Sequence, residues 1–287
     1  MAISNEPKGT TPSTVANSSN AILPGTTFPA NGLATHTKDN SALQDPPLSF
    51  DGPVVHGKPT TVTLYEPSQL AGSPAIPSLY HVVNRAFSES HQATGCLPAS
   101  LNRLDSPEQF MLQVGNDPGT FVYIITWAGT DQAIATVGAH RYVTPVVISD
   151  IGSGKKGTTF QRVHLPKAPG EVEAGDAWEL KLMVVDPGLQ GQGLASYLMT
   201  LVDEEAKRRC KDSGLVAAET TTKEEGLGAG TLQRRLLYMV LTAVKECTEL
   251  FYTRRGYTPD YETAYEPGFM GSPKGFHVIH MSKVLEV

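Results

Sequence analysis

The stretch that decides the fold is residues 182–195, LMVVDPGLQGQGLA. An apolar strand ends at Asp186-Pro187, a glycine-rich turn follows, and an amphipathic helix is expected from Gly191 to about Lys211. Glycines let successive backbone N–H groups converge on an anion, and the helix dipole adds to the attraction at a helix N-terminus. The stretch therefore predicts a cradle for a phosphate or diphosphate group.

Two familiar phosphate cradles do not fit this turn. A P-loop requires G-x-x-x-x-G-K-[ST], and the closest string, at residues 154–156, lacks both the earlier glycine and the Ser or Thr. A dinucleotide fingerprint requires a third glycine where this chain has Ser196, and the acidic residue that would bind the ribose is missing from the polar segment downstream.

The rest of the chain predicts an α/β protein with one mixed sheet and helices on both faces. Apolar periodicity and turn residues predict the elements along the chain. They are a strand at 61–65, helices at 76–91 and from Pro107, strands at 120–127, 132–143 and 177–185, the helix at 191–211, a strand at 236–244, a helix at 248–255, and strands at 257–265 and 276–285. Residues 236–244 favour a buried parallel strand, with a helix as the competing interpretation.

Two motifs now carry a resemblance to a known family. Gln190-x-x-Gly193-x-Ala195, preceded by a strand and Val-Asp-Pro, closely resembles the [RQ]-x-x-G-x-[GA] coenzyme A loop of the GNAT acyltransferase superfamily. Residues 251–257, FYTRRGY, resemble that superfamily's aromatic-Tyr-x-[KR]-x-G-[FY] element. The predicted order of elements matches the same fold, so the resemblance covers roughly residues 61–285.

The resemblance implies a binding site for acetyl-CoA. In such proteins the two central parallel strands, here 178–185 and 236–244, splay apart at their C-terminal halves, and the unpaired backbone must find partners. The resemblance assigns these partners to the pantetheine arm, and by position the Met183 amide would stabilise the oxyanion that develops on the thioester carbonyl. The implied cofactor-binding residues are Met183, Val184, Val185, Gln190, Gly191, Gln192, Gly193, Leu194, Ala195 and Ser196. The lysines at 155–156 and the arginines at 234–235 are either solvated charges or contacts to the 3′-phosphate of coenzyme A.

The expected reaction, direct attack of a neutral amine on the thioester, needs a base and benefits from an acid. The resemblance places Tyr252 as the acid, and the alternative is a packed aromatic residue. It places Glu179 as the base, and the alternative is an ion pair with Lys181 or a helix residue; His140 is the reserve base. Strand alternation predicts two sets of side chains on opposite faces of the sheet. One set is Glu179, Lys181, Met183 and Val185, and the other is Trp178, Leu180, Leu182 and Val184.

Composition narrows the class of protein. No run of about 20 apolar residues exists, so we expect no membrane association. The net charge of -6, without a clustered basic face, argues against a nucleic-acid partner. Three widely spaced cysteines give neither a disulfide framework nor zinc-ligand spacing, so we expect no metal and a cytoplasmic location.

The domain organisation follows from composition along the chain. Residues 1–58 are rich in Ser, Thr, Asn, Gly and Pro and form a predicted disordered or loosely docked leader, of which parts near Phe50 can dock on the domain. Residues 59–287 form the predicted acyltransferase domain, with inserts at about 144–176 and 213–235.

The leading functional hypothesis is an N-acetyltransferase that acts on a primary amine of a small molecule in a ternary complex. The alternatives are acetylation of a protein lysine or N-terminus, and a non-catalytic sensor or scaffold that binds coenzyme A. The sequence carries no indication of an oligomeric state.

Overall fold

The computed structural model describes residues 46–115, 119–142, 162–164, 177–214 and 236–287. The chain divides into two units, Met1–Ser41 and Ala42–Val287, and every described element belongs to the second unit. None of the helices in the described ranges combines the length and the apolar character that crossing a membrane requires.

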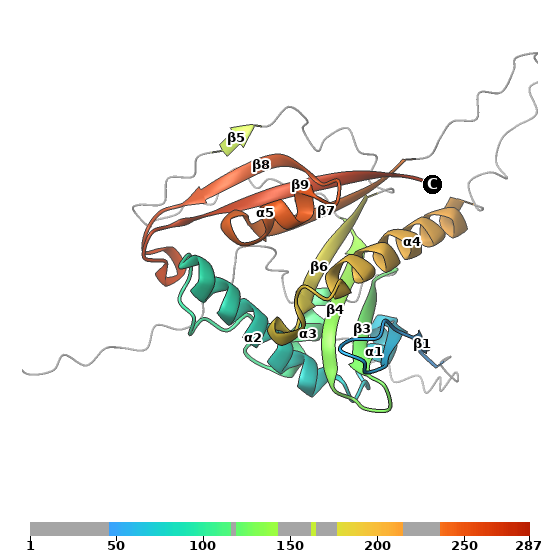
Figure 1. The fold of residues 1–287 in the computed structure, drawn as a ribbon. Helices are drawn as coiled ribbons and strands as arrows, with labels where there is room; N and C mark the ends of the chain where they lie inside the picture. The colour runs from blue at the N-terminus through green and yellow to red at the C-terminus, as the bar shows by residue number, and fades with distance from the viewer. Residues whose placement is uncertain (1–45, 116–118, 143–161, 165–176, 215–235) are drawn as a thin grey trace, which may run out of the picture. The chain divides into compact units, whose positions relative to one another are not determined.

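The described residues form one nine-stranded mixed sheet, which confirms the predicted fold class (Figure 1). The strands are β1 (Leu48–Asp51), β2 (Thr60–Tyr65), β3 (Phe121–Trp127), β4 (Ala133–Arg141), β5 (Arg162–His164), β6 (Ala177–Val185), β7 (Leu236–Val244), β8 (Thr258–Tyr265) and β9 (Phe276–Glu286). The helices are α1 (Pro67–Leu70), α2 (Ile76–Thr94), α3 (Pro107–Val114), α4 (Leu194–Gly214) and α5 (Lys245–Thr253), with short 3₁₀ turns η2 (Pro187–Leu189) and η4 (Phe269–Gly271). The sheet order is β1-β2-β3-β4-β6-β7-β9-β8-β5, and the β6–β7 pair is parallel while the other pairs are antiparallel.

Two of these strands lie outside the predicted elements. β1 pairs with β2, and Val55, which follows β1, is only 1% exposed, so the folded domain includes residues that the sequence analysis placed in the leader. β1 contains Phe50, and this is the part of the leader that the sequence analysis allowed to dock on the domain. β5 pairs with β8 and falls inside the insert at about 144–176, in which the sequence analysis placed no element. The rest of the leader, most of that insert and residues 215–235 lie outside the described residues.

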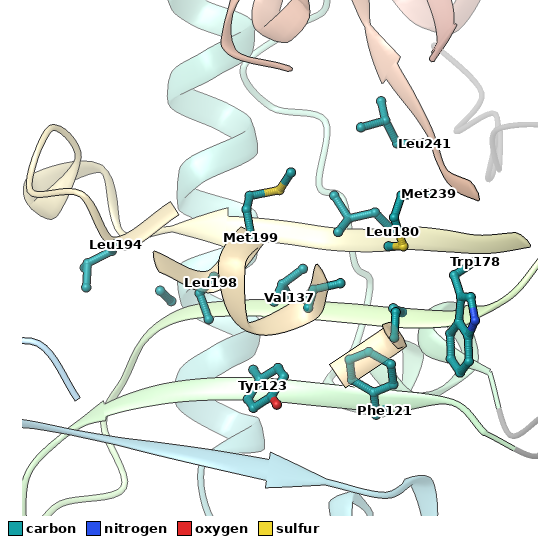
Figure 2. Packing of buried hydrophobic residues seen from close by; sticks show 14 of the residues in the cluster. Phe121, Tyr123, Val137, Trp178, Leu180, Leu194, Leu198, Met199, Met239 and Leu241 are labelled. Carbon is teal, nitrogen blue, oxygen red and sulfur yellow. The ribbon is translucent and has the colours of Figure 1, made fainter. Parts of the chain in front are cut away.

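Helices cover both faces of the first half of the sheet. On one face α4 covers β3, β4 and β6, and Leu194, Leu198 and Met199 belong to the same buried cluster as Phe121 and Val137 (Figure 2). On the other face α2 and α3 cover β3, β4 and β6 through a second buried cluster. Each helix buries one apolar stripe, as its sequence periodicity predicts.

A bulge in β6 changes which side chains face which helix. One residue on β4 lies between Thr136 and Gly138, whereas two residues on β6 lie between their partners Val184 and Lys181. Leu182 supplies the extra residue, with a left-handed φ of 48° that a bulky side chain rarely adopts.

The predicted alternation along β6 is therefore wrong beyond the bulge. Trp178 and Leu180 pack in the cluster with α4, whereas Leu182 and Val184 pack in the cluster with α2 and α3. The inserted residue shifts the side-chain period by one position, which exchanges the two faces.

Arg209 fixes α4 on the sheet. Its guanidinium bonds Glu66, which precedes α1, contacts the Glu205 carboxylate at 2.6 Å, and donates to the Gly119 carbonyl at 3.0 Å. The same group lies 4.7 Å from the centroid of the Phe121 ring. These contacts hold α4, and with it the turn that precedes α4, at a defined position.

We expect the boundary to be measurable by truncation. Removal of residues 1–45 should leave the melting temperature nearly unchanged, because the composition of that segment supplies almost no core. Removal of residues 1–58 should lower it by several degrees, since burial of a valine is worth about 1.5–3 kcal/mol and 1 kcal/mol shifts Tm by about 2–4 °C at this size. Equal melting temperatures for the two truncated chains, measured by calorimetry, would contradict a structural role for β1 and Val55.

Candidate active site

The centre of the sheet opens between its two parallel strands. β6 and β7 pair only through Ala177–Tyr238, Trp178–Met239 and Glu179–Val240, although both strands are described in full and continue for several residues. The edge of β6 from Leu180 to Val185 therefore faces a gap instead of a neighbouring strand. This is the splay that the resemblance implies.

Backbone groups of β6 point into this gap. The Asp186 N–H donates to the Ile134 carbonyl on β4 at 2.8 Å. Because consecutive residues in an antiparallel ladder direct their backbone groups to opposite edges, the Val185 amide and carbonyl point away from β4, toward the gap. Gln190 Nε2 lies 3.5 Å from the Val185 carbonyl oxygen, so the turn reaches the same edge.

The glycine-rich turn lies at the end of β6. Asp186 accepts a hydrogen bond from the Gly188 N–H at 2.9 Å and forms an ion pair with Arg85 of α2. Gly191 and Gly193 have φ values of 79° and 83°, and a Cβ on either would meet open space. Backbone conformation requires glycine here, and the absence of side chains leaves the turn accessible.

The N-terminus of α4 begins inside this turn. The first backbone hydrogen bond of the helix runs from the Tyr197 N–H to the Gly193 carbonyl at 3.0 Å. The preceding amides have no acceptor within the helix, and they carry the positive end of its dipole. The turn can therefore bind a diphosphate through backbone groups, as its sequence predicts.

Tyr252 lies in the same hydrophobic cluster as Leu194, the first residue of α4. Its ring is 7% exposed and packs 5.7 Å from the ring of Tyr257. No group within the described ranges forms a hydrogen bond with its hydroxyl. Burial raises the pKa of Tyr252 to about 12, and the charge of Arg255 opposes this shift. The hydroxyl is therefore protonated at neutral pH.

Glu179 makes two polar contacts where the strands part. Its carboxylate lies 3.0 Å from His140 Nε2 on β4 and 3.3 Å from Lys181 Nζ on β6. Burial raises the pKa of this carboxyl, but the His140 hydrogen bond and the Lys181 charge outweigh burial, and the net pKa is lowered. The ion pair with Lys181 that the sequence analysis kept as an alternative is present, and His140 joins it.

Further polar side chains share the face of Glu179. Directly paired residues have side chains on one face, and the ladders pair Glu179 with Val240 and Val240 with Ser282. Next to them the His280 ring stacks on Tyr261 at 3.9 Å, and the Ser282 hydroxyl donates to Asp260 at 2.8 Å. We call this face, formed by Glu179, His140, Lys181, Asp260, Tyr261, His280 and Ser282, the polar face.

The polar face and Tyr252 lie on opposite sides of the sheet. Glu179 alternates with Trp178 and Leu180, which pack with α4, so its carboxylate points to the other face. Tyr252 belongs to the cluster on the α4 side. The gap between β6 and β7 is therefore bordered by an acidic group from one face and by a tyrosine from the other.

More than half of the chain matches the model of one protein family. The model of the GNAT acetyltransferase family matches residues 79–227, just over half of the chain. The chain belongs to the GNAT acetyltransferase family. The match ends before β7, so the 251–257 motif lies outside it. Members of this family bind acetyl-CoA, and the resemblance inferred from the sequence is confirmed.

Similar solved structures come from several bacteria. The ribosomal-protein-S18-alanine N-acetyltransferase from Escherichia coli is 15% identical, with 79% of this chain and 95% of that chain covered and a TM-score of 0.44. The GNAT domain of S. lividans PAT is 16% identical, with 83% of this chain and 97% of that chain covered and a TM-score of 0.44. The structure of yncA from Salmonella typhimurium, solved with its cofactor acetyl-CoA, is 12% identical, with 79% of this chain and 93% of that chain covered and a TM-score of 0.39. No curated protein sequence matches the chain.

The structure brings together some predicted site residues and adds others. It places Gln190 to Ser196 in one turn beside the open edge of β6, and it joins Glu179 to both Lys181 and His140. Sequence reasoning missed Asp260, Tyr261 and His280, because neighbouring positions on β8 and β9 become visible only when the strands pair. The lysines at 155–156 and the arginines at 234–235 lie outside the described residues. The catalytic roles stay predictions.

We predict that the contacts of Glu179 stabilise the fold in a pH-dependent manner. A carboxyl whose pKa is lower in the folded than in the unfolded state stabilises the fold above its unfolded-state pKa, and this contribution disappears as pH falls through the folded-state pKa. Glu179→Gln should therefore lower the melting temperature at pH 7, and the difference from wild type should shrink below the ordinary value of 4.5.

The matched control is Glu89→Gln, at an exposed position on α2. This variant should change the melting temperature little at either pH. A different result would contradict the prediction. If the difference in melting temperature between Glu179→Gln and wild type widens as the solution is acidified, the carboxylate is destabilised by burial and the assigned contacts are wrong.

Proposed function

We propose that this protein is an N-acetyltransferase that transfers the acetyl group of acetyl-CoA to a primary amine of a small molecule. The observation that supports this most directly is the parting of β6 and β7 after Glu179, with the glycine-rich turn at the end of the open edge. Direct transfer in a ternary complex needs both reactants to meet, and a gap through the sheet gives them a place to do so.

The residues present fit acetyl-CoA. Buried backbone groups along β6 have no strand partner in the gap, and such groups require hydrogen bonds. We assign Met183, Val184 and Val185 to the pantetheine arm, with Val185 best placed because its amide points into the gap. We assign the turn from Gln190 to Ser196 to the diphosphate. When bound, acetyl-CoA supplies the thioester whose carbonyl carbon accepts the amine.

Tyr252 holds the proton that the departing sulfur needs. Its hydroxyl is protonated at neutral pH, and it has no hydrogen-bond partner in the described ranges, so it is available to a ligand. The Met183 amide, next to the strained Leu182, is the donor that we assign to the thioester oxygen. Backbone strain of this kind costs about 1–3 kcal/mol and concentrates at functional sites.

The polar face receives the amine. In the described part of this face, Glu179 and Asp260 supply two carboxylates, and we assign a cationic acceptor to this side of the sheet. The incoming amine must lose a proton, and Glu179 is the group that we assign to accept it, directly or through a water molecule. Because its lowered pKa makes Glu179 a weak base, His140 at 3.0 Å is the neighbour that can share the proton.

We predict that Gly193→Val weakens coenzyme A binding at least tenfold. The left-handed φ of 83° at Gly193 disfavours a β-branched residue, and the added side chain would occupy the accessible side of the turn. Titration calorimetry with coenzyme A gives the dissociation constant. The matched control is Gly129→Val, because Gly129 has a φ of 72° and open space but lies in the β3–β4 turn.

Both glycine variants should lose similar stability, and only Gly193→Val should lose affinity. Undiminished affinity in Gly193→Val would mean that the turn does not hold the ligand.

The proposed activity is tested by thiol release from acetyl-CoA in the presence of a panel of small amines and of lysine peptides. We expect thiol release from acetyl-CoA in the presence of a small amine. Tyr252→Phe should lower kcat by about 100-fold to 10,000-fold, the usual effect of a lost general acid, while the affinity for coenzyme A stays within about twofold. Because the pKa of Tyr252 is raised to about 12, wild-type kcat should show no alkaline fall near the ordinary tyrosine pKa of about 10.

Three results would contradict parts of this proposal. Release with peptides alone would replace the small-molecule acceptor by a protein. Tight binding of coenzyme A without release would indicate a sensor. A kcat of Tyr252→Phe within about twofold of wild type would make Tyr252 a packing residue.

A further inference from the structure

A cavity of about 640 Å³ lies beside the glycine-rich turn, between the start of α4 and the 251–257 motif. It is bounded by the first turns of α4, by the end of α5 and by β9, through residues that include Ser196, Asp203, Phe251, Arg254, Arg255 and Lys283. Ser196 is the third residue of α4, so the cavity begins where the proposed diphosphate site ends.

We propose that this cavity binds the 3′-phosphate of coenzyme A through the guanidinium groups of Arg254 and Arg255. The inference rests on the proposed use of acetyl-CoA, and it assigns the feature by which this chain distinguishes coenzyme A from its 3′-dephospho form.

The charge of the cavity fits a phosphomonoester dianion. Lys283 Nζ contacts the Asp203 carboxylate at 2.6 Å, so these two charges compensate each other. Arg254 has no ion-pair partner in the described part of the chain, and Arg255 bonds only uncharged groups there. The cavity therefore keeps two uncompensated positive charges, which match the charge of the ligand group.

The Arg255 guanidinium is held in a fixed orientation. It lies over the Phe251 ring at 3.5 Å from the ring centroid, donates to the Phe251 carbonyl at 2.8 Å, and bonds the Ser196 hydroxyl. Its buried Nε has no hydrogen-bond partner within the described ranges. Burial lowers the pKa of Arg255; the charge of Tyr252 opposes this shift, and the charge of Arg254 adds to it to a smaller extent.

Chemistry selects the 3′-phosphate among possible anions. Coenzyme A carries a diphosphate and a 3′-phosphate on one ribose, so the two groups require neighbouring sites. The Ser196–Arg255 contact joins the start of α4 to the end of α5 and brings the two proposed sites together. A planar, preorganised guanidinium suits a phosphate better than a flexible ammonium group does.

The test compares dissociation constants of coenzyme A and 3′-dephospho-coenzyme A by titration calorimetry. Wild type should bind coenzyme A at least about tenfold more tightly, since hydrogen bonds to charged groups contribute on this scale. Arg254→Gln and Arg255→Gln should each weaken coenzyme A binding by about tenfold to 100-fold and leave 3′-dephospho-coenzyme A within about threefold. Arg254 is exposed, so its variant should fold even if Arg255→Gln does not.

The matched control is Lys211→Gln, which removes one exposed positive charge at the far end of α4. It should leave both dissociation constants unchanged. Two results would overturn the 3′-phosphate site while leaving the proposed cofactor intact. One is equal affinity of wild type for the two ligands, and the other is an equal loss of affinity for both ligands in the arginine variants. No binding of either ligand to wild type would overturn the proposed cofactor together with this site. Inorganic phosphate that binds wild type saturated with coenzyme A, but not Arg254→Gln, would place a separate anion in the cavity and also overturn the proposal.

Discussion

The parting of β6 and β7 is the constraint on which the rest of the structure depends. The two halves of the sheet share only three paired positions, the last of them Glu179–Val240. A sheet that opens at its centre leaves backbone groups without partners, and the protein tolerates this only where a ligand or solvent can satisfy them. The bulge at Leu182 lies on the same stretch of β6, so the distorted segment and the open edge coincide.

Contacts outside the ladder hold the two halves of the sheet together around this gap. On one side the Lys283–Asp203 pair ties β9 to α4. On the other side the end of α2 and the segment after it contact the β8–β9 connection and β9, where Lys274 Nζ donates to the Thr94 carbonyl at 2.7 Å and Cys96 packs in one cluster with Phe276. The opening therefore has fixed walls, which is the preorganisation that a transfer reaction requires.

The two faces of the sheet carry different chemistry because of this opening. The α4 side presents backbone amides, glycines and two arginines, all suited to anionic groups. The opposite side presents the carboxylates of Glu179 and Asp260 with the stacked Tyr261 and His280. Under the proposed function, an anionic donor and a cationic acceptor would approach the gap from opposite faces, and neither would have to displace the other.

The sequence by itself determined the features that depend on residues close together in the chain. Strand, glycine turn and helix at 177–214 follow from local periodicity and from the backbone freedom of Gly191 and Gly193, and the family resemblance follows from that pattern. Only the tertiary structure decided how Glu179 is paired, where β1 and β5 join the sheet, and which face each β6 side chain occupies. These properties depend on register between distant segments, and a single inserted residue at Leu182 exchanges the faces without leaving a signal in the apolar pattern.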